Sequence, residues 1–173
     1  MTSTAPDSLP DRAVLLALQD LTTELTADGG DLGAQSENEA RLAIAALLTA
    51  AGAREIDPAE VLPDDAAAMM AARRLLRLST EDPDTARVAD DVLSHPPGDD
   101  QMSLELAVAG AVVLGALIGW LQTKVHIRIT RVDGKTEFEF EARKAAASPR
   151  LLQTVASTVS ELLGAPPGPP PPA

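Results

Sequence analysis

The sequence LELAVAGAVVLGALIGWLQTKVHIRITRVDGKTEFEFE, residues 104–141, decides the fold of this chain. Its first half is rich in small apolar residues and contains no charged residue from Leu106 to Leu121. Its second half alternates apolar and polar residues on both sides of Asp133 and Gly134. A long apolar run is typical of a buried helix, and strict alternation is typical of a β-strand. The stretch therefore predicts an apolar helix that runs directly into a β-hairpin.

Asp133 and Gly134 form the predicted turn, because a two-residue type I′ turn needs positive φ at both central positions. Centring the hairpin there sets five opposite pairs: Ile129–Phe138, Ile127–Phe140, Arg128–Glu139, His126–Glu141 and Thr130–Glu137. Apolar residues then meet on one face, and basic or polar residues meet glutamates on the other. A slip of one residue would lose both matches, so the alternation itself supports this register. Because a lone hairpin is marginal in water, we expect its apolar face to pack on helices.

The helix before the hairpin carries small residues at every fourth position: Ala107, Ala111, Gly115 and Gly119. Such a stripe lets another backbone approach closely. Because a glycine costs about 1 kcal/mol relative to alanine in a helix, we expect close packing along this stripe. The helix is either buried at the centre of the fold or a membrane span. As a span it is short, since an uncharged stretch from Leu106 to Leu121 reaches about 24 Å against a hydrocarbon core of about 30 Å.

Charge is distributed unevenly along the chain. Residues 1–100 hold 20 Asp or Glu and 7 Lys or Arg, whereas residues 101–173 hold 6 and 7. The acidic first part argues against a nucleic-acid partner, because such binding rests on neutralising phosphates. It predicts a solvated acidic surface or, alternatively, a surface for a basic partner. The sequence has no cysteine, which excludes disulfides and a cysteine nucleophile and fits a reducing cytosol.

Four further helices are expected before the apolar helix, from apolar residues at helical spacing and from capping residues. They cover about residues 10–25, 36–51, 63–78 and 82–94. Ser36 to Glu39 is a capping box, and Asp82 with Pro83 is expected to cap the fourth helix. A last helix, about residues 148–163, follows the hairpin and ends at Gly164.

Breaks in these patterns divide the chain into three parts: an acidic helical region (1–98), a helix–hairpin–helix unit (99–164) and a proline-rich tail (165–173). The first boundary follows His95, where Pro96, Pro97 and Gly98 end the helical pattern. The tail is expected to be extended and disordered, as a spacer or, alternatively, as a ligand for a groove in another protein.

No pattern in the sequence predicts a catalytic, cofactor-binding or metal site. The sequence contains neither the Gly-x-Ser-x-Gly motif of serine hydrolases nor the His-Glu-x-x-His motif of zinc proteases. The Gly-x-Gly-x-x-Gly motif of dinucleotide-binding proteins is absent as well. His126 and Glu141 are interpreted as a surface pair rather than as a general base with its carboxylate. Lys124 and Arg128 compete for the glutamates of the second strand, which argues against a metal there.

Arg73, Arg74 and Arg77 form the basic cluster of the acidic region. The simpler interpretation is that they pair with nearby carboxylates. The alternative is a docking patch for a carboxylate or phosphate group, which guanidinium recognises well.

From Gly115 onward, GALIGWLQTK is followed by VHIRITRVDG, then TEFEF, then a helix. This order resembles the C-terminal half of the effector-associated constant component family (first type), over about residues 105–163. The shared motif rests on Trp120, Leu121, Asp133 and Gly134. Members of that family lie beside caspase-like or trypsin-like effectors and nucleotide-dependent switches in actinobacterial conflict systems, and are proposed to act as coupling adaptors. The resemblance implies no catalytic residue, and four helices stand here where that family has a strand-and-helix portion.

Together these patterns predict a mainly helical α+β protein: an acidic helical bundle followed by an apolar helix, a β-hairpin and a C-terminal helix. The expected function is a non-enzymatic cytoplasmic adaptor that binds an effector protease or switch protein, or a second copy of itself. The alternative is a single-pass membrane protein anchored by residues 104–121, with the hairpin in the cytoplasm because basic residues follow the span. The residues expected to make the interaction are Ala111, Gly115, Gly119, Trp120, Lys124, Arg128 and Glu139. No cofactor, metal or nucleic acid is expected to bind.

Overall fold

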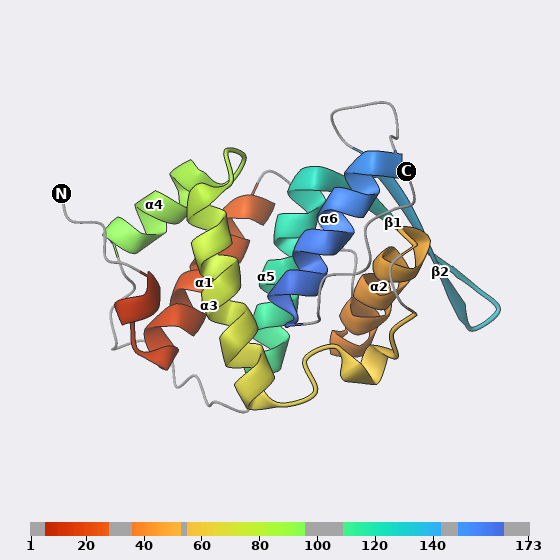
Figure 1. Ribbon diagram of the computed structural model, residues 1–173, viewed down its shortest axis with the longest axis horizontal. Coiled ribbons are helices and arrows are strands. Elements are labelled where there is room, and N and C mark those ends of the chain that lie inside the picture. Colours follow the sequence, from red (N-terminus) through yellow and green to blue (C-terminus); the bar gives the residue numbers. More distant parts are fainter. Residues whose placement is uncertain (1–5, 28–35, 53–54, 96–108, 143–148, 165–173) are drawn as a thin grey trace.

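A computed structural model describes residues 6–27, 36–52, 55–95, 109–142 and 149–164 (Figure 1). Over these residues the chain is a mainly helical α+β protein, as predicted, with six α-helices and one two-stranded antiparallel sheet. The elements are η1 (Pro6–Ser8), α1 (Asp11–Thr26), α2 (Glu37–Ala50), η2 (Pro58–Glu60), α3 (Asp65–Glu81), α4 (Ala86–Ser94), α5 (Ala109–Lys124), β1 (Val125–Val132), β2 (Lys135–Ala142) and α6 (Pro149–Leu162), where η marks a short 3₁₀ turn.

Side-chain caps start two helices of the acidic region, and the first of them is the expected capping box. The Ser36 hydroxyl accepts a hydrogen bond from the Glu39 N–H at 3.2 Å, which starts α2. The Asp64 carboxylate accepts one from the Ala67 N–H at 2.7 Å, which starts α3. Each cap satisfies a backbone donor that has no partner inside its own helix.

The expected cap of α4 is wrong. Asp82 is the residue that ends α3, and α4 begins later, with Thr85 at its N-cap. The Asp82 side chain accepts a hydrogen bond from the Asp84 N–H at 2.9 Å and turns toward α5. The carboxylate therefore belongs to a tertiary contact rather than to a helix start.

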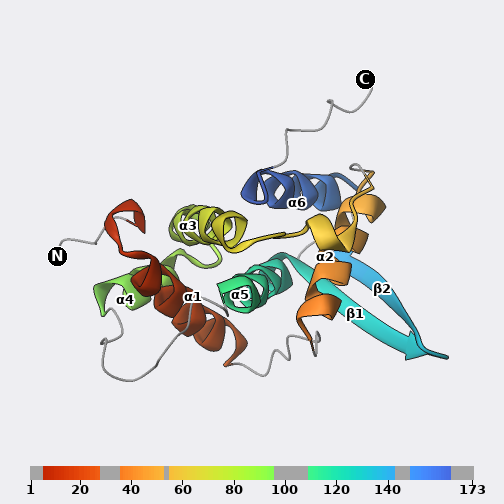
Figure 2. The same ribbon diagram turned by 90° about the horizontal axis from the view of Figure 1, so that it is seen from below.

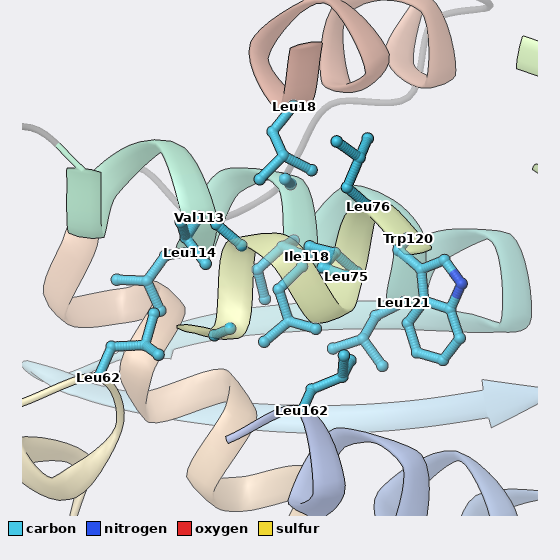
Figure 3. Close-up of a cluster of buried hydrophobic side chains, with 14 of the residues drawn as sticks. Leu18, Leu62, Leu75, Leu76, Val113, Leu114, Ile118, Trp120, Leu121 and Leu162 are labelled. Carbon is cyan, nitrogen blue, oxygen red and sulfur yellow. The ribbon is translucent and has the colours of Figure 1, made fainter. Parts of the chain in front are cut away.

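The apolar helix α5 occupies the centre of the fold, as predicted for a buried helix. It packs most extensively on α1, then on α3 and α2, and Figure 2 shows these helices around it. Its buried side chains include Leu114, Leu117 and Ile118, each 1% exposed. Figure 3 shows α5 side chains meeting leucines of α1, α3 and α6 in one cluster. The described helices of the ranges 1–98 and 99–164 therefore share one core.

The last helix, α6, packs on α2 and α3. Val155, Val159 and Leu162 form its buried stripe, as expected from their spacing. The Arg74 guanidinium donates hydrogen bonds to the carbonyl oxygens of Glu161 (3.2 Å) and Leu162 (3.4 Å). These carbonyls lack partners within a helix that ends there, so an arginine of α3 caps α6.

The hairpin leaves this helical body on one side. In Figures 1 and 2 its turn end projects beyond α2. Within the part of the chain that the structure describes, no helix has both the length and the apolar character needed to cross a membrane. Ala107 of the small-residue stripe, the boundary at residues 96–98 and the proline-rich tail lie outside the described residues.

Candidate interaction surface

The hairpin has the predicted register. Asp133 and Gly134 have φ angles of +51° and +75°, which is the backbone that a type I′ turn requires. The Cα partners are the five expected pairs, from Thr130–Glu137 to His126–Glu141. One face of the hairpin is therefore apolar and the other is charged.

The outer backbone edges of the hairpin follow from this register. The pair that flanks a two-residue turn is hydrogen-bonded, and such pairs alternate with non-hydrogen-bonded ones along an antiparallel ladder. The Val132–Lys135 pair flanks the turn, so Ile129–Phe138 and Ile127–Phe140 are non-hydrogen-bonded pairs. The N–H and C=O groups of such pairs point away from the partner strand. The two strands form the whole sheet, and these four residues make no other backbone hydrogen bond within the described ranges. The outward backbone groups of these residues therefore have no backbone partner within the described part of the chain.

The charged face carries more negative than positive charge. Arg128 and Glu139 form an ion pair at 3.7 Å, with both side chains more than 60% exposed. Glu137 lies opposite Thr130, and Glu141 lies opposite His126. Within the residues that the structure describes, neither of these two glutamates forms an ion pair. β2 therefore presents a row of carboxylates of which one is neutralised.

The apolar face is partly covered by the helical body. Ile127, Phe138 and Phe140 are half-buried and pack against the core. At the far end of the same face, Arg131 pairs with Glu39 in the first turn of α2. The Arg131 Nε lies 2.7 Å from one carboxylate oxygen and its Nη2 lies 2.8 Å from the other. This two-point contact fixes the hairpin relative to α2.

The root of the hairpin is held by a polar cluster around Asp82. The Trp120 Nε1–H donates to Asp82 Oδ2 at 3.0 Å, and the Lys124 Nζ lies 2.6 Å from both Asp82 Oδ1 and Asp84 Oδ2. Trp120 is 3% exposed, and Figure 3 shows its indole nitrogen at the rim of the apolar cluster. The ammonium also lies 5.9 Å from the centre of the indole ring. The cluster joins the last turn of α5 to the corner between α3 and α4.

The pKa of Lys124 reflects this environment. Burial lowers the pKa of the ammonium, but the hydrogen bonds and the charges of Asp82 and Asp84 outweigh it, so this pKa lies above its ordinary value of 10.5. Lys124 is thus a charged, internally bound group.

The residues that were expected to interact lie in three different settings. Trp120 and Lys124 are engaged inside the fold, as above, and Arg128 and Glu139 are exposed on the hairpin. The small-residue stripe is divided: Ala111 is exposed, Gly115 is half-buried and Gly119 is buried. A Cβ placed on Gly115 would meet nothing within 4 Å. Within the described residues, the expected close backbone approach at Gly115 is therefore not found.

The arginine cluster of α3 pairs inside the protein, as the simpler interpretation expected. Arg73 lies 2.6 Å from Asp11 and also donates to the Leu9 carbonyl, while Arg77 pairs with Asp7. Arg74 caps α6. Each guanidinium therefore ties a distant segment to α3.

Sequence reasoning missed two contacts that fix the hairpin: Asp82 with Trp120 and Lys124, and Glu39 with Arg131. Asp82 and Glu39 were each interpreted as helix caps, which is a local role. The signal that was available is the spacing of Trp120 and Lys124, which puts an indole N–H and an ammonium on one face of the last turn of α5. An indole N–H and an ammonium side by side at the edge of a core predict a carboxylate that binds both. The spacing does not identify which Asp or Glu supplies it.

A hollow of about 360 Å³ lies between α1 and α4. Its lining residues are Asp20, Thr23, Glu24, Asp91, Val92 and His95. The His95 Nδ1 lies 3.7 Å from a carboxylate oxygen of Asp91, and both side chains are about 80% exposed. The hollow is polar and negatively charged, in keeping with the acidic composition of this part of the chain.

Comparison of the chain with models of known families, with curated proteins and with solved structures finds no match.

Proposed function

We propose that this protein is a non-enzymatic adaptor of the cytoplasm and that it docks a partner protein through its hairpin. The observation that carries the proposal is the hairpin itself, which projects from the helical body with backbone edges that are unpaired among the described residues. An open strand edge offers a row of hydrogen-bonding groups to another chain. A protein that keeps such an edge exposed has a surface ready for a partner.

The way in which the hairpin is held supports a docking role. Asp82 binds Trp120 and Lys124 at its root, and Glu39 binds Arg131 near its turn. A surface that is fixed before binding loses less conformational entropy when a partner arrives. The hairpin is therefore suited to present its edge in one orientation.

The resemblance around Trp120 supplies the proposed class of partner. The family that it resembles lies beside protease effectors and nucleotide-dependent switches in bacterial conflict systems. We propose that the partner is one of these two kinds and that the adaptor couples it to the rest of such a system. The hairpin lies within the range that carries the resemblance.

Site-specific photo-crosslinking in the cells that naturally produce the protein tests this function. A photoreactive amino acid replaces Glu139 on the hairpin or, as the matched control, exposed Arg87 on α4. We expect the hairpin probe to form an adduct with one protein that the control does not reach. Mass spectrometry then identifies it as a protease effector or a nucleotide-dependent switch. Equal adducts from both positions, or none from the hairpin, would contradict the proposal.

A further inference from the structure

We infer that the outer edge of β2 receives a β-strand of the partner protein in which basic residues alternate with apolar ones. We call this surface the β2 edge; it comprises the outward backbone groups of Thr136, Phe138 and Phe140 and the carboxylates of Glu137, Glu139 and Glu141. This inference rests on the proposed docking function. It adds the chemistry of the partner and the strand of the hairpin to which the partner binds.

The backbone of β2 sets where the incoming strand lies. Thr136, Phe138 and Phe140 belong to non-hydrogen-bonded pairs with β1, so their N–H and C=O groups point away from it. Within the described part of the chain these groups have no backbone partner. A strand placed there at the usual spacing of about 4.8 Å would satisfy all of them.

The charges of β2 set one face of that strand. Glu137, Glu139 and Glu141 are exposed and point to the same side, because side chains alternate along a strand. Across the hairpin they face Thr130, Arg128 and His126, of which only the arginine forms an ion pair in the described structure. Residues of an incoming strand that lie opposite these glutamates are therefore favoured when they are basic, since opposite charges across strands attract.

The aromatic residues of β2 set the other face. Phe138 and Phe140 pack against the core but remain half-buried, so part of each ring still contacts solvent. Residues of the incoming strand that lie opposite them would cover this remaining surface if they are apolar. The alternation of basic and apolar residues follows from these two faces together.

β1 shows that β2 already accepts this pattern on its inner side. In β1, Ile127 and Ile129 alternate with His126, Arg128 and Thr130. The partner strand would repeat that arrangement on the outer side of β2.

A second copy of this chain fits the β2 edge poorly in the symmetric register centred on Glu139. Two antiparallel β2 edges centred on Glu139 would place Glu137 opposite Glu141 and Glu139 opposite itself. Like charges directly opposite each other on paired strands are destabilising. The carboxylate row thus disfavours this symmetric register and favours a strand that places basic residues opposite the glutamates. We assign that strand to another protein, and pairing with β1 of a second copy is an outcome that the test distinguishes.

The test uses full-length ¹⁵N-labelled protein and a blocked peptide in which arginine alternates with isoleucine. We expect the peptide to shift the amide signals of Thr136, Phe138 and Phe140 while those of Ile127 and Ile129 stay in place. A peptide with glutamate in place of arginine should not bind. The variant Glu137→Lys/Glu141→Lys should weaken binding at least about tenfold, since two attractive charge pairs become repulsive.

Three further variants separate charge from backbone. Thr136→Pro removes an outward N–H of β2 while keeping the ladder to β1, so it should abolish binding. Its control, Ile129→Pro, blocks the β1 edge in the same way and should change affinity by less than about twofold. Glu81→Lys/Asp90→Lys makes the same charge change at exposed sites of α3 and α4 and should also bind within about twofold. Circular dichroism verifies that each variant keeps its helices.

Three results would overturn the inference: no shift at the β2 amides, equal binding by Glu137→Lys/Glu141→Lys, or loss of binding in Ile129→Pro alone. A dimer of the protein that Thr136→Pro dissociates would also overturn it, because the occupant would then be a second copy. If crosslinks from the hairpin to another protein persist in cells after such a result, the docking function stands and only the β2 edge is wrong. If those crosslinks are absent as well, the function itself fails.

Discussion

Trp120 in α5 and Phe138 in β2 are both large aromatic residues close to the core, but their surroundings differ. Trp120 is 3% exposed and its indole N–H is bound to Asp82. Phe138 is half-buried, and its outward backbone groups have no partner in the described chain. The two residues represent two regions: a helical body in which a buried donor such as the Trp120 N–H has an internal acceptor, and a hairpin whose outward backbone groups have no backbone partner within the described residues.

This difference shows that the chain connects a well-packed helical body directly to an accessible hairpin. α5 runs directly into β1, so the helix with the most buried residues leads into a strand that is largely exposed. The contacts of Asp82 and Glu39 fix the hairpin without covering its edges. Substitutions in the two regions should therefore differ in their effect on folding.

The largest effect is expected from truncation of a core residue of α5. Leu117 is 1% exposed, so Leu117→Ala should lower the free energy of unfolding by about 2–5 kcal/mol through lost burial and a cavity. Ile129 is half-buried on the hairpin, and Ile129→Ala should cost less than about 1 kcal/mol. Denaturant unfolding of both variants measures the contrast, and equal losses would mean that the hairpin is as well packed as the body.

The next largest effect should come from Asp82. Asp82→Ala leaves the buried Trp120 N–H without an acceptor and leaves the Lys124 ammonium with Asp84 alone, which should cost about 3 kcal/mol. Asp84→Ala, the matched control, leaves both donors a carboxylate and should cost about 1 kcal/mol or less. If thermal unfolding shows the two variants to be equally stable, the cluster does not hold the root of the hairpin.

A smaller effect is expected from the ionisation of Lys124. Its pKa is raised in the folded state, so its stabilising contribution is complete below its ordinary value of 10.5 and is lost as pH rises through the folded-state pKa. The free energy of unfolding should therefore fall more steeply above pH 10.5 in the native chain than in Lys124→Met. Lys135→Met, beside the exposed turn, is the control for removing a lysine elsewhere on the hairpin. Identical slopes in all three proteins would contradict the assignment.

The smallest effect concerns the small-residue stripe. Gly115→Ala adds a Cβ that meets nothing within 4 Å, so it should stabilise the chain by about 0.5–1 kcal/mol through helix propensity. Gly134→Ala, at a φ of +75°, should instead destabilise the hairpin by about 1 kcal/mol. A loss of stability in Gly115→Ala would show that another backbone does approach the stripe in solution.

Local patterns predicted much of the fold. The turn residues and the period of two determine the register of the hairpin, since both signals lie within one short segment. The caps at Ser36 and Asp64 follow from side chains that reach only their own backbone. The burial of α5 follows from its uncharged composition.

Contacts between distant segments could not be predicted in the same way. The Asp82 carboxylate looks like a helix cap in the sequence, and only the packing of α5 against α3 gives it Trp120 and Lys124 as partners. Ala111 is exposed and Gly115 is half-buried. Their exposure depends on which sides of α5 the other helices cover, and the sequence does not give this. Helical spacing fixes which residues share a stripe but not what that stripe faces.

Amide hydrogen exchange along the hairpin tests the open edge most directly. The account predicts alternation: the outward amides of Thr136, Phe138 and Phe140 exchange rapidly, whereas the inward amides of Glu137, Glu139 and Glu141 are protected by β1. The same amides, measured in the free full-length protein, serve as each other's control. Equal protection of both sets would show that β2 is already covered on its outer side, and the proposed docking surface would then be wrong.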